Sequence, residues 1–414
     1  MKEFFPGIPM VSYEGSYSSN PFAFKFYQQD RIIAGKPMRE HLRFALSFQS
    51  PLPVALMPGA PDPIRDAKGR AQALLELMHK LGLSYYTLRD RDLAPEAGSL
   101  RESNARLDET AECLLFLQQA YAVRPLTVSV DLSSHPRYIE GAATSPSADV
   151  FAFAAAQTKK ALELAQRLGA LSFCIPGERE GGGQLFCVND LLAQGNLAQL
   201  LRFTAEYAAL LGFGGQLCAA PAASPALQDD AYWRDGEACL AFLRRHHLEQ
   251  TYQICLPASA SPQALRTLLD ANALFSLETR GQESAPSLVP QAALAMLALL
   301  RGGSLPAGGL TLYPLPAPGS NTPEDLCIAL VQRMDAYALG LHLAQRTLLD
   351  GRLEQFLRER YASYGYGVGR AVVEGGASLT SLEQYALQKG DASPASGRQE
   401  YLGAVLDSLL FRNA

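Results

Sequence analysis

The sequence lacks the residues that mark several classes of protein. Its seven cysteines are odd in number and widely scattered, and no two of them form a C-x-x-C pair. Neither a zinc site nor a disulfide framework is therefore indicated, and most of these thiols lie in apolar stretches that predict burial. No basic run occurs and the net charge is −5, which argues against a nucleic-acid-binding protein.

Long apolar runs are also missing. No uninterrupted stretch reaches the roughly 18 apolar residues of a membrane span, and the opening MKEFFPGIPM lacks a long apolar core. We therefore expect no membrane association and a cytoplasmic location. With 414 residues, 48% hydrophobic and 19% charged, the chain has an ordinary globular composition and room for one large α/β barrel or two smaller domains.

Short apolar segments alternate with helical patterns along the first 300 or so residues. The segments predicted as strands are 44–48, 83–88, 126–132, 171–175, 214–220, 252–257, 274–279 and 308–315, with helical patterns at 70–81, 108–121, 147–168, 191–211, 236–247 and 290–301. Ser261-Pro262 and Thr322-Pro323 have the chemistry of helix starts. Eight such units predict a (β/α)₈ TIM barrel. A doubly wound sheet is the alternative, although no G-x-G-x-x-G follows the first strand.

The domain boundaries follow from where this alternation begins and ends. We predict an N-terminal segment over 1–40, a barrel over 41–345 and a C-terminal helical arm over 346–414, where strand signals stop. Such an arm must bury its apolar face somewhere, and a partner subunit is a natural place. The arm therefore predicts a homo-oligomer, either a dimer or a tetramer.

A barrel places its functional groups at the C-terminal ends of its strands. The second strand ends in Arg89-Asp90-Arg91-Asp92 and the seventh in Glu278-Thr279-Arg280. Three later strands end in alanine, proline or tyrosine, so few acids and no imidazole gather there. The paired carboxylates are open to two interpretations, acid–base or metal chemistry on one side and salt bridges with the interleaved arginines on the other.

Long stretches of the chain resemble the xylose isomerase family from end to end. The matching segments include KEFFPGI, FKFYQQDRIIAGKPMREHLRFAL, RDLAPEAGSLRESNARLDE, PRYIEGAATSPSADVFAFAAAQTKKALELAQRLG, EREG, GGLTL and DGRLEQFLRERYASYGYGVG. The resemblance implies a TIM barrel with a C-terminal arm, commonly assembled as tetramers. In active members two divalent ions, Mg²⁺, Mn²⁺ or Co²⁺, promote aldose–ketose isomerisation by a hydride shift.

The catalytic positions implied by the resemblance are altered. Arg89 occupies the place of the histidine in the family's His-Asp-x-Asp pattern, while Asp90 and Asp92 are retained. Arginine stays protonated and cannot shuttle a proton near neutral pH. The family's Trp-His pair after the first strand falls on Gln49 and Ser50, and the tryptophan of its WGGREG pattern falls on Pro176.

The implied metal ligands are altered further. The family's Glu-Pro-Lys motif falls on Ala220-Pro221-Ala222, its Glu-Ala-Asn-His motif on Pro257-Ala258-Ser259-Ala260, and the aspartate of NFDAK on Tyr313. The aspartate of DANQGD corresponds to Glu278, and no acid occupies 284–291 where GWDTDQF would lie. Hard divalent cations require several anionic oxygens, so we predict that no metal cofactor binds.

The resemblance and the departures together predict a folded homologue without metal-dependent isomerase activity, a pseudoenzyme. It could be a structural or regulatory partner, assembling with itself or with an active xylose isomerase. It could bind a sugar or acid in the vacated pocket, for which the candidates are Gln49, Pro176, Arg179, Ala222 and Arg280. Residual conversion of D-xylose to D-xylulose with an altered site is the third hypothesis. For a pseudoenzyme, Arg89, Asp90, Asp92 and Arg179 are predicted to form an ion-pair cluster, and Trp233 to be a packing or interface residue.

Overall fold

The computed structural model describes residues 3–49, 52, 62–181, 187–222, 231–279, 285–303, 305–313, 319–320, 322–390 and 398–411. The chain divides into two compact units, Met1–Gly340 and Leu341–Ala414, which are described separately below. The boundaries predicted at residues 40 and 345 remain predictions beside this division. No helix within the described part of the chain is long and apolar enough to cross a membrane.

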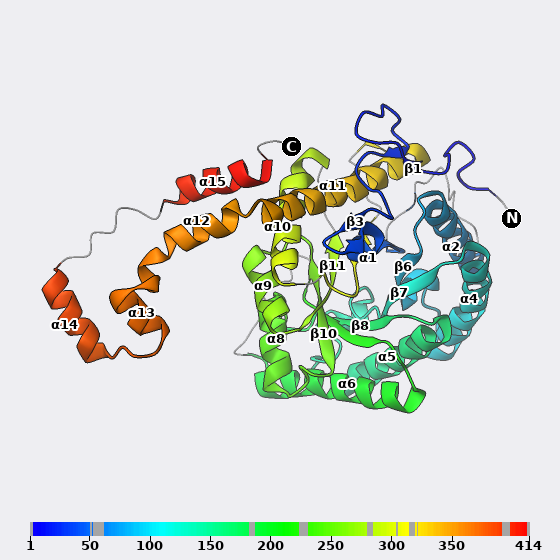
Figure 1. The fold of residues 1–414 in the computed structure, drawn as a ribbon. Coiled ribbons are helices and arrows are strands. Elements are labelled where there is room, and N and C mark those ends of the chain that lie inside the picture. The colour runs from blue at the N-terminus through cyan, green and yellow to red at the C-terminus, as the bar shows by residue number, and fades with distance from the viewer. Residues whose placement is uncertain are drawn as a thin grey trace. The chain divides into compact units, whose positions relative to one another are not determined.

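The first unit is built around a closed barrel of parallel strands, which lies inside a ring of helices (Figure 1). Its strands are β5 (Phe44–Ser47), β6 (Tyr85–Arg89), β7 (Arg124–Ser129), β8 (Ser172–Pro176), β9 (Gln216–Ala220), β10 (Tyr252–Pro257), β11 (Leu274–Thr279) and β12 (Leu310–Leu312). Each pairs with the next in sequence, and pairing of β12 with β5 through Thr311 and Ala45 closes the ring. This confirms the TIM barrel and excludes the open doubly wound sheet.

The helices alternate with the strands as the sequence pattern predicts. They are α2 (Pro63–Lys80), α3 (Asp90–Leu93), α4 (Leu100–Tyr121), η1 (Pro136–Tyr138), α5 (Ala148–Leu168), α6 (Asp190–Leu211), α8 (Gly236–Arg245), α9 (Pro262–Asp270), α10 (Ala285–Arg301) and α11 (Pro323–Asp350). The predicted caps are confirmed, because the Ser261 hydroxyl accepts the N–H of Ala264 at 3.1 Å and the Thr322 hydroxyl accepts that of Asp325 at 3.1 Å.

Residues before the barrel form four short strands and one helix: β1 (Ser12–Tyr13), β2 (Ala23–Phe24), β3 (Ile32–Ile33), β4 (Lys36–Pro37) and α1 (Met38–Leu42). Two buried carboxylates attach this segment to barrel helices. Glu76 of α2 accepts the backbone N–H groups of Phe4 and Phe5 at 2.9 and 2.8 Å. Asp335 of α11 accepts those of residues 25, 26 and 27 at 2.7–2.9 Å. These contacts satisfy backbone donors that lack a strand partner.

The second unit is helical. It holds the end of α11, α12 (Arg352–Arg360), η3 (Ala362–Gly365), α13 (Gly367–Val373), α14 (Leu379–Lys389) and α15 (Gln399–Phe411). The end of α11 contacts α15, since Arg346 donates to the Leu410 carbonyl at 2.8 Å. Many apolar side chains of this unit are exposed, and α14 buries none of its residues.

The seven cysteines are all free thiols, and five of them are buried. Cys174, Cys218 and Cys255 lie on the neighbouring strands β8, β9 and β10 and form one apolar cluster with Ala220 and Phe275. The prediction of buried free thiols is confirmed for most of the set. Small side chains at these positions let the barrel interior close tightly below its C-terminal mouth.

Candidate functional site at the barrel mouth

One small cavity lies at the C-terminal ends of the barrel strands. It measures about 30 Å³, which is room for one or two water molecules. Six positions singled out from the sequence meet around it: Gln49, Arg89, Pro176, Ala220, Glu278 and Tyr313. Its wall is completed by residues that sequence reasoning did not select, namely Thr87, Leu88, Thr127, Ser129, Cys174 and Glu178.

Arg89 is the last residue of β6 and the centre of the charged part of the mouth. Its Nε lies 3.7 Å from Asp92, and its Nη1 lies 3.9 Å from both Asp131 and Glu178. These separations are too long for hydrogen bonds but allow strong Coulomb attraction in a partly buried site. Asp92 also accepts the backbone N–H of Arg89 at 2.9 Å, which starts the short helix α3.

Asp131 and Glu178 share a partner in Ser133. The Ser133 hydroxyl lies 2.5 Å from Glu178 and 3.4 Å from Asp131. Asp131 further accepts the N–H groups of Ser133 and Ser134 at 3.1 and 2.9 Å. Burial opposes its ionisation, but the charge of Arg89 and these hydrogen bonds together hold the pKa of Asp131 below its ordinary value.

Asp90 points into the barrel wall and does not line the cavity. Its carboxylate accepts the N–H of Asp131 and the amide of Gln157, both at 2.8 Å, and lies 3.6 Å from Nε of Arg91. Complete burial raises the pKa of Asp90 to about 6, against the opposing charge of Arg91. Asp90 therefore braces β6, β7 and α5 through one buried network.

The mouth contains an ion-pair cluster, as predicted, but two of the four predicted members do not belong to it. Arg89 and Asp92 are paired as expected, but Asp90 pairs with Arg91 rather than with Arg89. Within the described residues Arg179 forms no ion pair, and Asp131 and Glu178 take its place around Arg89. Only closure of the barrel reveals these partners, because they follow two other strands in the sequence.

The part of the mouth formed by the ends of β11 and β12 carries Glu278 and Tyr313. The Tyr313 hydroxyl donates to Glu278 at 3.3 Å, and the Tyr313 carbonyl accepts from Arg333 at 2.6 Å. Tyr313 is thereby fixed over the only carboxylate retained among the five positions that the resemblance matches to metal ligands.

These positions do not fit a two-metal centre. Ala220, Pro257 and Ala260 present carbon where anionic oxygen or imidazole is needed, and Ala220 belongs to the apolar cluster beneath the cavity. Across the described ranges no group of three or more histidine, cysteine, aspartate or glutamate side chains is placed to hold a metal ion. Ser50 and Arg280, two further positions named from the sequence, lie outside the described residues.

Trp233 packs behind the mouth. The side chain is fully buried, contacts Phe242 edge-on and lies against Gly177, where an added Cβ would be 2.7 Å from its ring. Its carbonyl accepts the N–H of Ala222 at 2.9 Å, which places Ala222 beside Trp233 and not among the residues that line the cavity. Of the two interpretations of Trp233, packing within the chain is the one that the contacts support.

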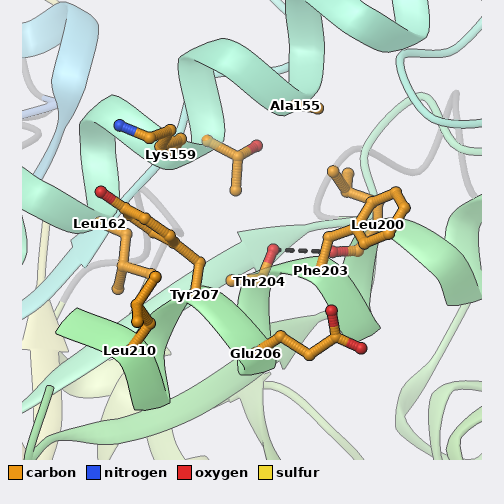
Figure 2. A pocket seen from close by; sticks show the side chains of 10 residues that line it. Ala155, Lys159, Leu162, Leu200, Phe203, Thr204, Glu206, Tyr207 and Leu210 are labelled. Atoms are coloured by element: carbon orange, nitrogen blue, oxygen red, sulfur yellow. Dashed lines mark hydrogen bonds between the residues drawn. The ribbon is translucent and has the colours of Figure 1, made fainter. Parts of the chain in front are cut away.

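A second, larger hollow lies on the outside of the barrel between α5 and α6 (Figure 2). It measures about 370 Å³ and has an apolar floor and rim formed by Ala155, Leu162, Leu200, Phe203, Tyr207 and Leu210. Lys159 and the Tyr207 hydroxyl both contact Glu163, at 2.5 and 2.7 Å. None of the sequence-selected site residues lines this groove.

The closed parallel barrel and its polar cavity define a TIM-barrel protein whose distinctive residues lie at the strand ends. The XylA2 C-terminal domain family matches residues 357–410. The xylose isomerase of Thermotoga petrophila is 36% identical over 439 residues, covering 100% of this chain and 99% of that protein. The enzyme of Caldanaerobacter subterraneus subsp. yonseiensis is 36% identical over 436 residues, covering 99% of each.

The chain belongs to the xylose isomerase family. A solved xylose isomerase-like TIM barrel protein from Mycobacterium smegmatis, in complex with magnesium, aligns at 12% identity and a TM-score of 0.45, covering 73% of this chain and 98% of that one.

Proposed function

We propose that this protein is a xylose isomerase homologue without metal-dependent aldose–ketose isomerase activity. The observation that carries the proposal is the loss of ligand atoms at two neighbouring strand ends, where Ala220 ends β9 and where Pro257 and Ala260 stand at and just after the end of β10. Losing even a partner of a ligand typically weakens metal binding or activity about 10–100-fold. Here the ligand groups themselves are replaced by carbon at the ends of both β9 and β10.

The altered proton-transfer position supports the same proposal. Arg89 lies where the family pattern has histidine, and its guanidinium is surrounded by carboxylates that stabilise the charged form. A group that stays protonated cannot serve as a general base, and general acid–base catalysis typically contributes about 10²–10⁴-fold.

In place of catalysis, the proposed role is that of a structural or regulatory partner, or of a protein that binds a sugar at the barrel mouth. Arg89, Gln49 and Tyr313 can donate hydrogen bonds at the mouth, and Glu178 and Glu278 can accept them, a combination that suits sugar hydroxyl groups. The exposed apolar residues of α12–α15 suit contact with another subunit. The proposal includes a homo-oligomer, assembly with an active xylose isomerase, and a cytoplasmic location.

The decisive experiment measures metal content and turnover on the same purified protein. We expect no stoichiometric Mg²⁺, Mn²⁺ or Co²⁺ by elemental analysis, and no conversion of D-xylose to D-xylulose when these ions are added. The Thermotoga petrophila enzyme, assayed in parallel, is the positive control. Bound divalent ion together with turnover above background would overturn the proposal and establish residual isomerase activity instead.

The sugar-binding form is tested by calorimetry with aldoses, ketoses and sugar acids in the absence of metal. We expect heat of binding from at least one class, and its loss in the Glu278→Gln variant if the mouth is the site. The regulatory form is tested by co-expression with an active xylose isomerase. Failure of the two chains to co-purify would remove hetero-assembly from the proposal and leave the homo-oligomer.

A further inference from the structure

Three carboxylates converge on a single guanidinium at the barrel mouth. Asp92 comes from α3, Asp131 follows β7 and Glu178 follows β8, and each lies 3.7–3.9 Å from a nitrogen of Arg89. The neighbouring Arg91 is directed to Asp90. The side chains of Asp92, Asp131 and Glu178 are all largely buried, at 12%, 4% and 17% exposed, so their charges are poorly screened by solvent.

We infer that Arg89 is a built-in counter-cation of the mouth, which holds these three carboxylates together and excludes divalent metal ions from them. The inference rests on the proposed function and deepens it. The family's reaction requires a cation that enters from solution, whereas here the positive charge is part of the chain. Arg89 is then a positioning and selectivity residue, not a catalytic one.

The geometry indicates that Arg89 acts on the three acids through its charge and not through directed hydrogen bonds. No contact from Arg89 to the three acids is short enough for a hydrogen bond, and its Nε is buried without a hydrogen-bond partner. Coulomb attraction at about 4 Å remains strong under partial burial. Three carboxylates gathered without a cation would repel one another, and an uncompensated buried charge is strongly destabilising.

Arg89 and Glu178 are complementary departures from the family pattern. The family pattern has histidine at the position of Arg89. Its WGGREG motif aligns with residues 176–181, so that Glu178 occupies the position of the second glycine. A new cation and a new anion thus stand on neighbouring parts of the mouth and face each other at 3.9 Å. The Ser133 hydroxyl, 2.5 Å from Glu178, fixes the carboxylate in that position. Simple erosion of a metal site does not explain a matched gain.

The charge of Arg89 opposes metal binding in addition to the missing ligand groups. A divalent ion bound by Asp131 and Glu178 would have to sit within a few ångströms of the guanidinium, because both acids contact the same nitrogen of Arg89. Repulsion between a unit charge and a divalent ion at that range, in a partly buried site, weakens binding by orders of magnitude. Removing the guanidinium should therefore raise the affinity of the mouth for cations.

The test compares Arg89→Met, Arg89→Lys and the Arg89→Met/Glu178→Gln pair with wild type. We expect Arg89→Met to lower Tm by about 5 °C or more, Arg89→Lys to lower it less, and Glu178→Gln to recover part of the loss in the Met background. Mn²⁺ binding followed by electron paramagnetic resonance should be at least about tenfold tighter in Arg89→Met than in wild type or Arg89→Lys. Arg39→Met, which breaks an exposed pair with Asp30, is the matched control and should leave both values unchanged.

An Arg89→Met protein with the Tm and Mn²⁺ affinity of wild type would overturn the inference. So would an Arg89→Lys protein that keeps the positive charge but binds Mn²⁺ about tenfold more tightly than wild type, which decides the matter even if Arg89→Met does not fold. These measurements use no sugar and compare variants. Turnover by the wild type would overturn the proposed function. The ranking of the variants by Tm and by Mn²⁺ affinity tests the role of Arg89 independently of turnover.

Discussion

Two carboxylates at the barrel mouth have pKa values shifted in opposite directions, although burial acts to raise both. Asp131 has a pKa below its ordinary value, because Arg89 and the N–H groups of Ser133 and Ser134 outweigh burial. Burial raises the pKa of Asp92 although the same arginine opposes the rise. Hydrogen bonding contributes to the difference, since the N–H groups of Ser133 and Ser134 stabilise the charged form of Asp131, whereas the N–H of Arg89 is the backbone donor to Asp92.

Asp90 leads to a prediction about pH. Its pKa is about 6 in the folded protein and about 4 in the unfolded chain. Between these values the folded state holds a proton that the unfolded state has lost, so the contribution of Asp90 to stability falls as pH rises through this window. Urea unfolding from pH 4 to pH 7 should show a larger loss in wild type than in Asp90→Asn, in which other buried acids with raised pKa values, such as Asp92, still titrate. Equal pH dependence in the two proteins would contradict the assignment.

At the scale of elements, the packing of Trp233 on the turn after β8 leaves no space for a side chain at position 177. An added Cβ there would meet the Trp233 ring at 2.7 Å. We expect Gly177→Ala to reduce the free energy of unfolding by about 1–3 kcal/mol, because overpacking forces neighbours out of position. Chemical denaturation measures the change.

Gly195 provides the matched control for that substitution. It lies inside α6, and an added Cβ would meet no atom within 4 Å. Gly195→Ala should stabilise the protein by about 1 kcal/mol through helix propensity. If both alanine variants were stabilised, the close packing of Trp233 on Gly177 would be contradicted.

At this scale the sequence predicts the strands and helices of the barrel but not the attachment of the N-terminal segment. Strand and helix positions follow from local periodicity and caps, and the eight predicted strand segments correspond to β5–β12. Attachment of the N-terminal segment does not, because Glu76 and Asp335 bind backbone groups remote in the sequence. Those acids look like ordinary helix residues until the chain folds.

At the scale of the whole molecule, the second unit leads to a prediction about assembly. Leu379 and Leu387 of α14 are 88% and 78% exposed, an arrangement typical of a surface that contacts another subunit. We expect sedimentation analysis to give a dimer or tetramer for wild type. Leu379→Glu/Leu387→Glu should shift it toward the monomer, because burying two new charges opposes association.

Gln384→Glu adds a charge at an exposed polar position of the same helix and is the control, expected to leave the assembly intact. Circular dichroism of each variant checks that the barrel stays folded. A wild type that sediments as a monomer, or an assembly indifferent to both leucine substitutions, would contradict a role for α14 in association.

The sequence by itself determined the barrel and the departures at Arg89, Ala220, Pro257, Ala260 and Tyr313, since periodicity and motif residues are local properties of the chain. Only the tertiary structure decided which acids surround Arg89 and that Asp90 turns away to Arg91. The physical reason is barrel closure. It brings together the ends of β6, β7 and β8, and charges far apart in the sequence then compete for the same guanidinium at distances where Coulomb energy is large.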